Sequence, residues 1–208
     1  MQRSPQNKKP CDGFSLLEIL IVAAIVGILA AVVLLGLNAS RETAKTAKAE
    51  VDQREMTGAI ELYFTDVGFY PPDVNRGWDP GFIRALPWNP DAEAGEIIPP
   101  EYASPNTNCS HCPPNWESIV QARWNGPYLS SWPRTTPWNG KYDYNYWANG
   151  ITRYGCVVAA GIYVGVQGNY LNNNNIPASA EQKMIDKGFD NDHCLNGESQ
   201  MLLWPLNH

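Results

Sequence analysis

The chain has 208 residues and a formal net charge of −6, a length that allows one modest domain with an appendage but not two domains with full cores. Its first 13 residues carry Arg3, Lys8 and Lys9 against Asp12, so the rest of the chain is more acidic still. A chain this acidic is not expected to bind nucleic acid through its average electrostatic field.

A continuous apolar run, FSLLEILIVAAIVGILAAVVLLGL, extends from Phe14 to Leu37 and contains a single charge, Glu18. At about 1.5 Å per residue, this run is long enough to cross a hydrocarbon core of about 30 Å as a helix. A short basic segment precedes this run. By the positive-inside rule, it predicts that the N-terminus stays in the cytoplasm and that the residues after the run, which form the head of the protein, face the periplasm.

Two simpler interpretations of the apolar run are open at this point. A secretory signal peptide could be cleaved near Leu37-Asn38-Ala39, but a secretory apolar region is typically about 7 to 15 residues long. A plain signal anchor needs the apolar run but gives Glu18 no purpose, and an acid at the bilayer centre costs about 2.5 to 3.5 kcal/mol. Glu18 therefore indicates a segment with a function beyond anchoring.

The hexapeptide Gly13-Phe14-Ser15-Leu16-Leu17-Glu18, followed by the apolar run, resembles the processing motif of type IV pilins and of the pseudopilins of type II secretion. The resemblance implies that a prepilin peptidase cuts between Gly13 and Phe14, that the new N-terminal residue is methylated, and that Glu18 helps subunits enter the fibre. Cleavage would create an α-amino group that is largely cationic at neutral pH. The Glu18 of a neighbouring subunit could pair with this amine, which makes both charges less costly in lipid.

The polar segment after residue 37 is rich in Ala, Glu, Lys and Arg and contains no helix breaker, which predicts that the helix continues to Phe64. The alternative is a separate membrane helix and soluble helix joined near residue 40. Three- and four-residue steps predict a narrow apolar stripe that faces the head. Its members are Ala44, Ala47, Val51, Gly58 and Leu62, with Glu55 as a polar interruption.

The head is predicted to be a small antiparallel sheet. Gly68, Pro71 and Pro72 end the helix, and sparse regular structure is expected up to about residue 139. The alternation over residues 141–146 predicts a strand with three tyrosines on one face, followed by a tight turn at Asn149-Gly150. Residues 156–166 and 200–204 are the second and third predicted strands.

These elements predict an α+β, pilin-like fold in which the sheet packs on the C-terminal half of the long helix. The predicted parts are a leader (1–13), a transmembrane and polymerisation helix (14–37), its amphipathic continuation (38–65) and the head (66–208). Two stretches of the head, GPYL at residues 126–129 and PWNGKYDY at residues 137–144, are similar to a segment of major pseudopilins. The long segment from Gly77 to Arg123 departs from that pattern, which leaves both a secretion pseudopilus and a surface pilus open.

Four cysteines lie in the exported head: Cys109, Cys112, Cys156 and Cys194. In an oxidising compartment they predict two disulfides. Three connectivities are possible. The favoured one pairs Cys156 with Cys194, which strand pairing could bring together, and leaves Cys109 and Cys112 to close a small loop. A zinc site or a redox pair that includes His111 is the alternative, but zinc would need a second close pair and thioredoxin-like chemistry a βαβ context.

Oxygen ligands gather in one loop-like segment near the C-terminus, KMIDKGFDNDHCLNGESQ. Such segments suit Ca²⁺, which accepts six to eight oxygens, and major pseudopilins resemble the chain in carrying a calcium site in a late loop. The candidate ligands are Asp186, Asp190, Asp192, Asn196 and Glu198. The segment does not match an EF-hand, and a solvated acidic loop is the alternative. No other cofactor is expected.

The predicted function is structural and non-enzymatic, because no catalytic motif stands out. The chain is expected to polymerise with copies of itself and with minor pilins or pseudopilins, after a prepilin peptidase has cut it and through an inner-membrane assembly platform. It is expected in the bacterial inner membrane before assembly, and in a periplasmic or extracellular filament afterwards. A membrane-anchored periplasmic enzyme or binding protein that does not polymerise is the alternative class.

Overall fold

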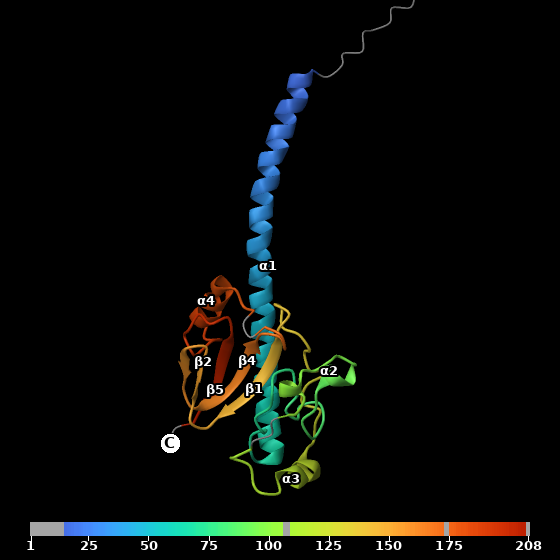
Figure 1. Ribbon diagram of the computed structural model, residues 1–208, viewed down its shortest axis with the longest axis vertical. Helices are drawn as coiled ribbons and strands as arrows, with labels where there is room; N and C mark the ends of the chain where they lie inside the picture. The colour runs from blue at the N-terminus through green and yellow to red at the C-terminus, as the bar shows by residue number, and fades with distance from the viewer. Residues whose placement is uncertain (1–14, 106–108, 173–174, 207–208) are drawn as a thin grey trace, which may run out of the picture. The chain divides into compact units, whose positions relative to one another are not determined.

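The computed structural model describes residues 15–105, 109–172 and 175–206, without the side chains of residues 34 and 35. Residues 1–41 and 42–208 form two compact units, and Figure 1 labels their elements. The helices are α1 (Leu16–Val67), α2 (Pro90–Glu93), η1 (Pro100–Tyr102, a 3-10 turn), α3 (Trp116–Arg123) and α4 (Ala178–Asp186). The strands are β1 (Lys141–Trp147), β2 (Ile151–Arg153), β3 (Cys156–Val158), β4 (Gly161–Gln167) and β5 (Ser199–Pro205).

Helix α1 is continuous across the boundary between the apolar run and the polar segment that follows it, as the sequence predicts. It ends three residues later than expected, at Val67, because Gly68 adopts a left-handed φ of 92°. The N–H of Gly68 donates to the carbonyl oxygen of Phe64 at 2.9 Å. A glycine in this conformation is a common helix stop, since it avoids the Cβ clash that other residues meet there.

The predicted apolar stripe of α1 is wrong about which face packs on the head. Its members are exposed: Ala44, Ala47, Val51, Gly58 and Leu62. The buried face instead follows Ala49, Gln53, Met56, Ile60 and Tyr63, which are spaced by three or four residues as helix geometry requires. The sequence pattern missed this face because polar residues occupy part of it.

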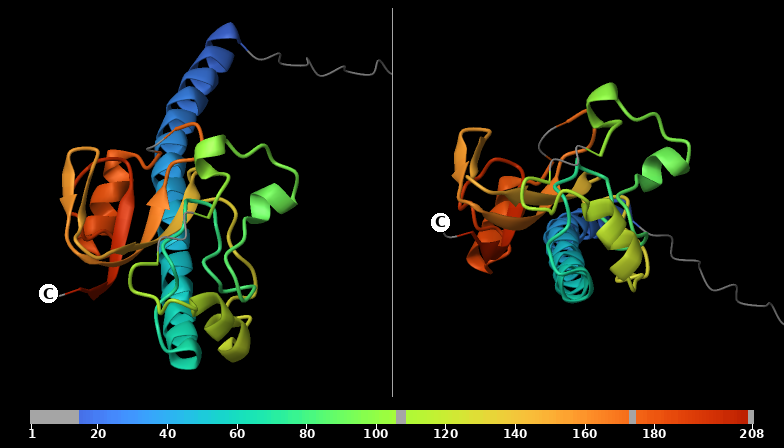
Figure 2. Two further views of the ribbon diagram at one scale, coloured as in Figure 1. Left: turned by 60° about the horizontal axis from the view of Figure 1, so that its bottom comes forward. Right: turned by 90° about the horizontal axis from the view of Figure 1, so that it is seen from below.

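The main sheet has the order β1-β4-β5, and both pairings are antiparallel. Figure 2 shows this sheet beside the C-terminal part of α1. Tyr142 and Tyr144 of β1 are buried while Tyr146 is half-buried, so the predicted strand and its tyrosine face are confirmed. Tyr142 donates its hydroxyl to Asp52 of α1 at 2.5 Å, which ties the helix to the sheet.

The predicted second strand, residues 156–166, is two strands in the structure. Between β1 and β4 the chain forms a small hairpin in which β2 pairs with β3. The reversal occurs at Tyr154 and Gly155, which both have positive φ (47° and 85°). Two successive residues of this kind form the turn that suits a two-residue hairpin loop. Asn149-Gly150 therefore leads β1 into β2 and does not join the two long strands.

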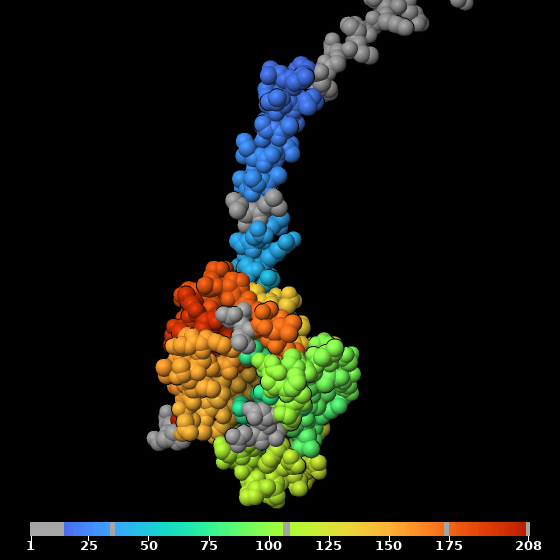
Figure 3. All heavy atoms as spheres, viewed as in Figure 1, coloured from blue at the N-terminus to red at the C-terminus, as the bar shows by residue number. Residues whose placement is uncertain are grey.

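The connection from Gly68 to Gly140 is sparse in regular structure, as expected, but it contains α3, which the sequence analysis missed. Asp79 organises its first part, because its carboxylate accepts from the backbone N–H of Phe82 (2.8 Å) and the indole N–H of Trp88 (2.7 Å). Phe82 is fully buried and meets the ring of Tyr63 edge to face. The space-filling view shows the connection (green) on the same face of the head as the β2–β3 hairpin (orange) (Figure 3).

Candidate functional site

The N-terminal site comprises the predicted cleavage point and Glu18. Gly13 and Phe14 lie outside the described residues, so the structure begins with Ser15. The N–H of Ser15 donates to a carboxylate oxygen of Glu18 at 2.8 Å, and the N–H of Glu18 donates to the hydroxyl of Ser15 at 3.2 Å. This reciprocal pair is a capping box, which satisfies two backbone donors at the start of a helix.

The capping box is a role of Glu18 that the sequence analysis missed, although the pattern Ser15-x-x-Glu18 is its ordinary signature. It also needs nothing from the leader, because Ser15 follows the predicted cleavage point. Glu18 is therefore engaged locally within one chain, and a charge interaction with a second subunit would have to compete with this contact.

The apolar half of α1 has no partner within the chain. Within residues 15–41 every side chain that the structure describes is exposed, including Leu16, Leu20 and Ile28. Of the described residues, α1 is the one helix long and apolar enough to cross a membrane. Exposing so much apolar surface to water is unfavourable by about 25 cal/mol per Å², so this segment requires lipid or other protein around it.

The acidic segment contains one buried carboxylate with a free oxygen. Asp190 is fully buried, and one of its oxygens accepts from the N–H of Gln200 at 3.0 Å. Among the described residues its second oxygen has no hydrogen-bond partner. Burial, with the nearby carboxylates of Asp192 and Glu181, raises the pKa of Asp190 to about 8. An ionised Asp190 would gain a counter-charge from a bound cation.

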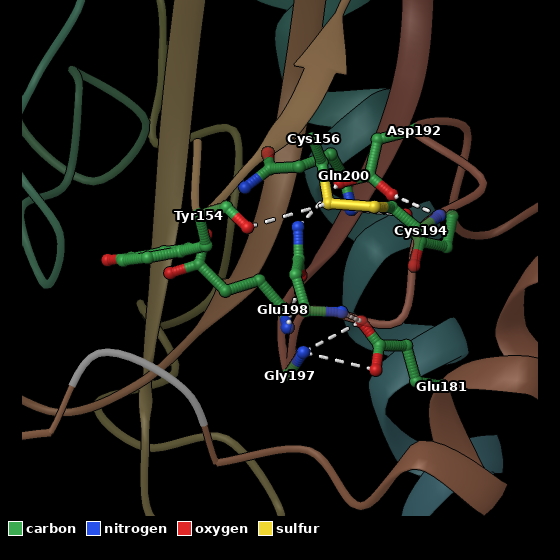
Figure 4. The surroundings of a disulfide bond; sticks show 10 residues. Tyr154, Cys156, Glu181, Asp192, Cys194, Gly197, Glu198 and Gln200 are labelled. Atoms are coloured by element: carbon green, nitrogen blue, oxygen red, sulfur yellow. Dashed lines mark hydrogen bonds between the residues drawn. A yellow bond between two sulfur atoms is a disulfide. The ribbon is translucent and has the colours of Figure 1, made fainter. Parts of the chain in front are cut away.

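Glu181 belongs to the same acidic neighbourhood, and the sequence analysis missed it. The predicted loop-like segment begins two residues later, at Lys183, whereas Glu181 lies on α4, which follows Pro177 and is rich in helix-favouring residues. Glu181 accepts from the N–H groups of Asn196 (2.8 Å) and Gly197 (2.9 Å), the latter drawn in Figure 4. Burial and the carboxylate of Asp192 raise the pKa of Glu181 to about 7.

The other predicted calcium ligands are divided between different contacts. Asp192 accepts from the side-chain amide of Asn196 at 3.0 Å, which keeps these two together. Asp186 is exposed at the end of α4 and accepts from Gln182. Glu198 is fully buried and pairs with Arg153 at 2.9 Å. Asp190, Asp192 and Glu181 thus lie near enough to influence one another electrostatically, but among the described residues the one group of side chains close enough to hold a metal ion is Cys109, His111 and Cys112. Asp186 and Glu198 have other partners.

The four head cysteines form two disulfides, Cys109–Cys112 and Cys156–Cys194. This is the connectivity favoured from the sequence, although Cys194 lies before β5 and not in a strand, so strand pairing is not what joins it to Cys156. The second disulfide joins β3 to the acidic segment beside Asp192, as Figure 4 shows. Cys109, Cys112 and His111 also lie close enough to hold a metal ion, but the two thiolates that zinc would need are joined to each other.

The helix with an apolar N-terminal half, the sheet beside its C-terminal half and Glu18 at the helix start define a type IV pilin-like protein. A family model, the prokaryotic N-terminal methylation motif, matches residues 8–34. The chain belongs to the family of the type II secretion system core protein G, the major pseudopilin. It is thus a structural subunit of a pilin-like filament.

Three relatives named type II secretion system core protein G support this assignment. The protein of Klebsiella pneumoniae is 30% identical over 104 residues, which cover 42% of this chain and 74% of the relative. The Pseudomonas aeruginosa protein is 30% identical over 123 residues (51% and 80%). The Aeromonas hydrophila protein is 29% identical over 110 residues (45% and 77%). No solved structure matches the chain significantly.

Proposed function

We propose that this chain is the repeating subunit of a type II secretion pseudopilus. A prepilin peptidase removes residues 1–13, Phe14 is methylated, and an assembly platform moves the subunit from the inner membrane into a periplasmic filament with other copies and minor pseudopilins. The observation that carries the proposal is the exposed apolar half of α1 headed by Glu18. This segment can be covered by lipid before assembly and by neighbouring helices afterwards. The role is structural and requires no catalytic centre.

The charge of Glu18 is proposed to pair with the cationic Phe14 amine of the adjacent subunit. Leaving one partner of a buried ion pair alone costs about 3 to 5 kcal/mol. At about 1.4 kcal/mol per decade, this corresponds to a loss of two to three decades in the association constant. Membrane insertion should not suffer, since removing a carboxylate from an apolar run lowers the cost of insertion.

Two substitutions separate this charge from the capping box. Glu18→Gln keeps a side chain that can cap Ser15, because glutamine serves in capping boxes, whereas Glu18→Ala loses both functions. We expect both variants to be inserted and cleaved but to yield few filaments, measured by shearing and sedimentation at equal amounts of processed subunit. Glu61→Ala, at an exposed site on α1, is the control. Wild-type yield from Glu18→Gln would reject the charge pairing.

Processing has its own test, mass spectrometry of the mature N-terminus. The expected product starts at a methylated Phe14, because Gly13 and Phe14 stand where the apolar run begins. An N-terminus near Ser40 would instead indicate a secretory signal peptide. An intact leader, with no filaments, would indicate the alternative class, a membrane-anchored protein that does not polymerise.

We further propose that the head binds Ca²⁺ at Asp190, with Asp192, Asn196 and Glu181 as neighbouring oxygen donors. The buried oxygen of Asp190 that has no hydrogen-bond partner among the described residues supports this, as does the repulsion that the carboxylates of Asp192 and Glu181 exert on Asp190. Of the sequence candidates, Asp186 and Glu198 are not included. When bound, the ion would neutralise the acidic neighbourhood and join α4 to the segment before β5.

Calcium binding is tested by thermal unfolding of the full chain in detergent. Millimolar Ca²⁺ should raise the melting temperature by mass action, and Asp190→Asn should abolish the increase. Asp186→Asn is the matched control, since Asp186 is exposed and has another partner, and it should respond like the wild type. An equal increase in the Asp190→Asn protein would exclude this site.

A further inference from the structure

The Cys109–Cys112 disulfide has a histidine in contact with it. The imidazole of His111 lies with Nε2 3.4 Å and Nδ1 3.7 Å from Sγ of Cys109. The ring is held in place, because it stacks on Tyr146 with ring centroids 3.5 Å apart and planes 15° from parallel. Cys109, His111 and Cys112 are all half-buried. An oriented imidazole therefore touches one sulfur of a short disulfide loop.

The hydrogen bonds of His111 determine which ring nitrogen carries its proton. Nε2 lies 3.1 Å from the carbonyl oxygens of both Tyr70 and Pro71. Carbonyl oxygens only accept hydrogen bonds, so the proton of the neutral ring is assigned to Nε2. Nδ1 is then left with a lone pair next to Cys109. Burial lowers the pKa of His111, so the ring is neutral while the disulfide is intact, and it is the negative charge of a departing Cys109 thiolate that would favour its protonation.

The second disulfide lacks such a neighbour. Within the described residues, no imidazole contacts the sulfur atoms of Cys156 or Cys194, and His193, next to Cys194 in the sequence, is exposed. Cys156 itself is buried. The two disulfides of this one head therefore differ in the chemistry that surrounds them, which makes the second an internal reference for the first.

We propose that Cys109–Cys112 is a reactive disulfide that exchanges with the thiols of a dithiol protein in the periplasm, and that His111 stabilises Cys109 as the leaving group. The incoming thiolate attacks Sγ of Cys112, the S–S bond breaks, and its electron pair leaves on Sγ of Cys109. Exchange is faster when the departing thiol has a lower pKa, and an adjacent histidine that becomes cationic lowers it.

The cycle balances without a further reagent. The first step leaves a mixed disulfide between Cys112 and the partner, with the Cys109 thiolate beside the imidazole, which takes up a proton at Nδ1. The second thiolate of the partner then attacks the partner's first sulfur, the one bonded to Cys112. This forms the partner's disulfide and releases the thiolate of Cys112. The partner dithiol is oxidised to a disulfide, while Cys109 and Cys112 are reduced to two thiols with two electrons and two protons.

The test compares the two disulfides in the full chain in detergent, with EDTA present to exclude metal capture. The protein is equilibrated with graded ratios of reduced to oxidised dithiothreitol at pH 7, free thiols are alkylated, and each cysteine is quantified by mass spectrometry. We expect Cys109–Cys112 to be half reduced at a ratio at least tenfold lower than Cys156–Cys194. If both disulfides are half reduced at the same ratio, the proposal is overturned, because that result is expected of two structural disulfides.

A pH profile tests the role of His111 separately. In the partly reduced protein, the rate of alkylation of Cys109 should reach half its maximum at least one pH unit below 8.5, the ordinary cysteine value. His111→Gln should move this midpoint back toward 8.5, while His193→Gln, beside the other disulfide, should leave it unchanged. A wild-type midpoint near 8.5, or one that His111→Gln does not move, would reject the imidazole–thiolate pair.

Discussion

Gln53 connects α1 to three other parts of the head and is fully buried. Its side-chain amide approaches the carbonyl oxygens of Val164 in β4 (3.1 Å) and Phe189 (3.4 Å), and the hydroxyl of Ser199 in β5 (3.3 Å). The hydrogen bonds of one residue thus fix the helix against two strands and the segment between them. These bonds offset the cost of burying the amide nitrogen, while the side-chain oxygen of Gln53 has no hydrogen-bond partner among the described residues.

Replacing Gln53 by alanine should destabilise the head by about 1 to 3 kcal/mol, because buried acceptors lose their donor. The measurement is urea unfolding of the full chain, followed by tryptophan fluorescence. Glu55→Ala is the control, since Glu55 is exposed on the same helix and surface substitutions usually change stability by less than about 0.5 kcal/mol. Equal losses from the two variants would contradict the anchoring role of Gln53.

The acidic neighbourhood should make stability depend on pH when calcium is removed by EDTA. The pKa of Asp190 is raised from 3.8 to about 8 by folding, so the folded state holds this proton more tightly than the unfolded state. Its stabilisation is complete below about pH 4 and is lost as the pH rises through 8. Glu181, raised from 4.5 to about 7, acts in the same direction.

We therefore expect the melting temperature of the EDTA-treated protein to fall between pH 6 and pH 9. Asp190→Asn should flatten this fall, because the amide does not ionise in this range but can still accept from Gln200. Calcium should oppose the fall in the wild type, since it binds the deprotonated carboxylates. A melting temperature that rises over this pH range would contradict the assigned direction.

From the sequence it was easier to predict which residues belong to the candidate sites than to predict which other residues they contact. The Phe14–Glu18 motif and the four cysteines could be recognised because each is close in sequence or chemically distinctive. Glu181 was missed because it lies on α4 and meets the loop of Asp190 and Asp192 through folding. Glu198 was included by its proximity in sequence, although its carboxylate pairs with Arg153 of β2.

At the scale of single elements, two glycines of the unit formed by residues 42–208 have opposite roles. Gly58 is exposed in the middle of α1, and an added Cβ would meet nothing within 4 Å. Gly140 precedes β1, and a Cβ there would lie 1.8 Å from the carbonyl oxygen of Gln167 in β4. A side chain at Gly58 would therefore meet no neighbour, whereas the lack of a side chain at Gly140 allows the backbone before β1 to approach the backbone of β4.

Gly58→Ala should stabilise the head by about 0.5 to 1 kcal/mol, because glycine in a helix interior costs about that much relative to alanine. Gly140→Ala should be destabilising, since the backbone of β4 would have to move. Both are measured by urea unfolding of the isolated subunit in detergent. A loss of stability in Gly58→Ala would show that this exposed position needs a glycine.

Elements whose local pattern agrees with their environment were predictable from the sequence. Tyrosines stand at every second position of β1 and share one face of the strand, and α1 has no helix breaker, so both elements were predicted within a few residues. The buried face of α1 was not, because Gln53 and Asp52 lie on it and bond to the sheet. The β2–β3 hairpin was missed because a tyrosine, Tyr154, occupies a positive-φ turn position that more often holds glycine or asparagine.

At the scale of the whole molecule, the structure separates the stability of the head from the membrane segment. Every buried core residue that the structure describes lies between Ala49 and Met201. The unit of residues 42–208 contains both disulfides and all five strands. The N-terminal unit, by contrast, has exposed side chains throughout its described part. The two units therefore make separable contributions, one to folding and one to assembly.

A fragment of residues 42–208, exported with a cleavable signal sequence, should fold alone and remain outside the membrane and the filament. It retains the whole core face of α1, so we expect one cooperative unfolding transition at a denaturant midpoint close to that of the processed full chain. A fragment that begins at Thr57 is the control, because it lacks Ala49, Gln53 and Met56 and should not fold. Without these three residues, the shorter fragment lacks part of the apolar core and the hydrogen bonds that Gln53 makes to the sheet. An aggregated or non-cooperative 42–208 fragment would mean that residues 16–41 also support the head, and the separation of folding from assembly would be wrong.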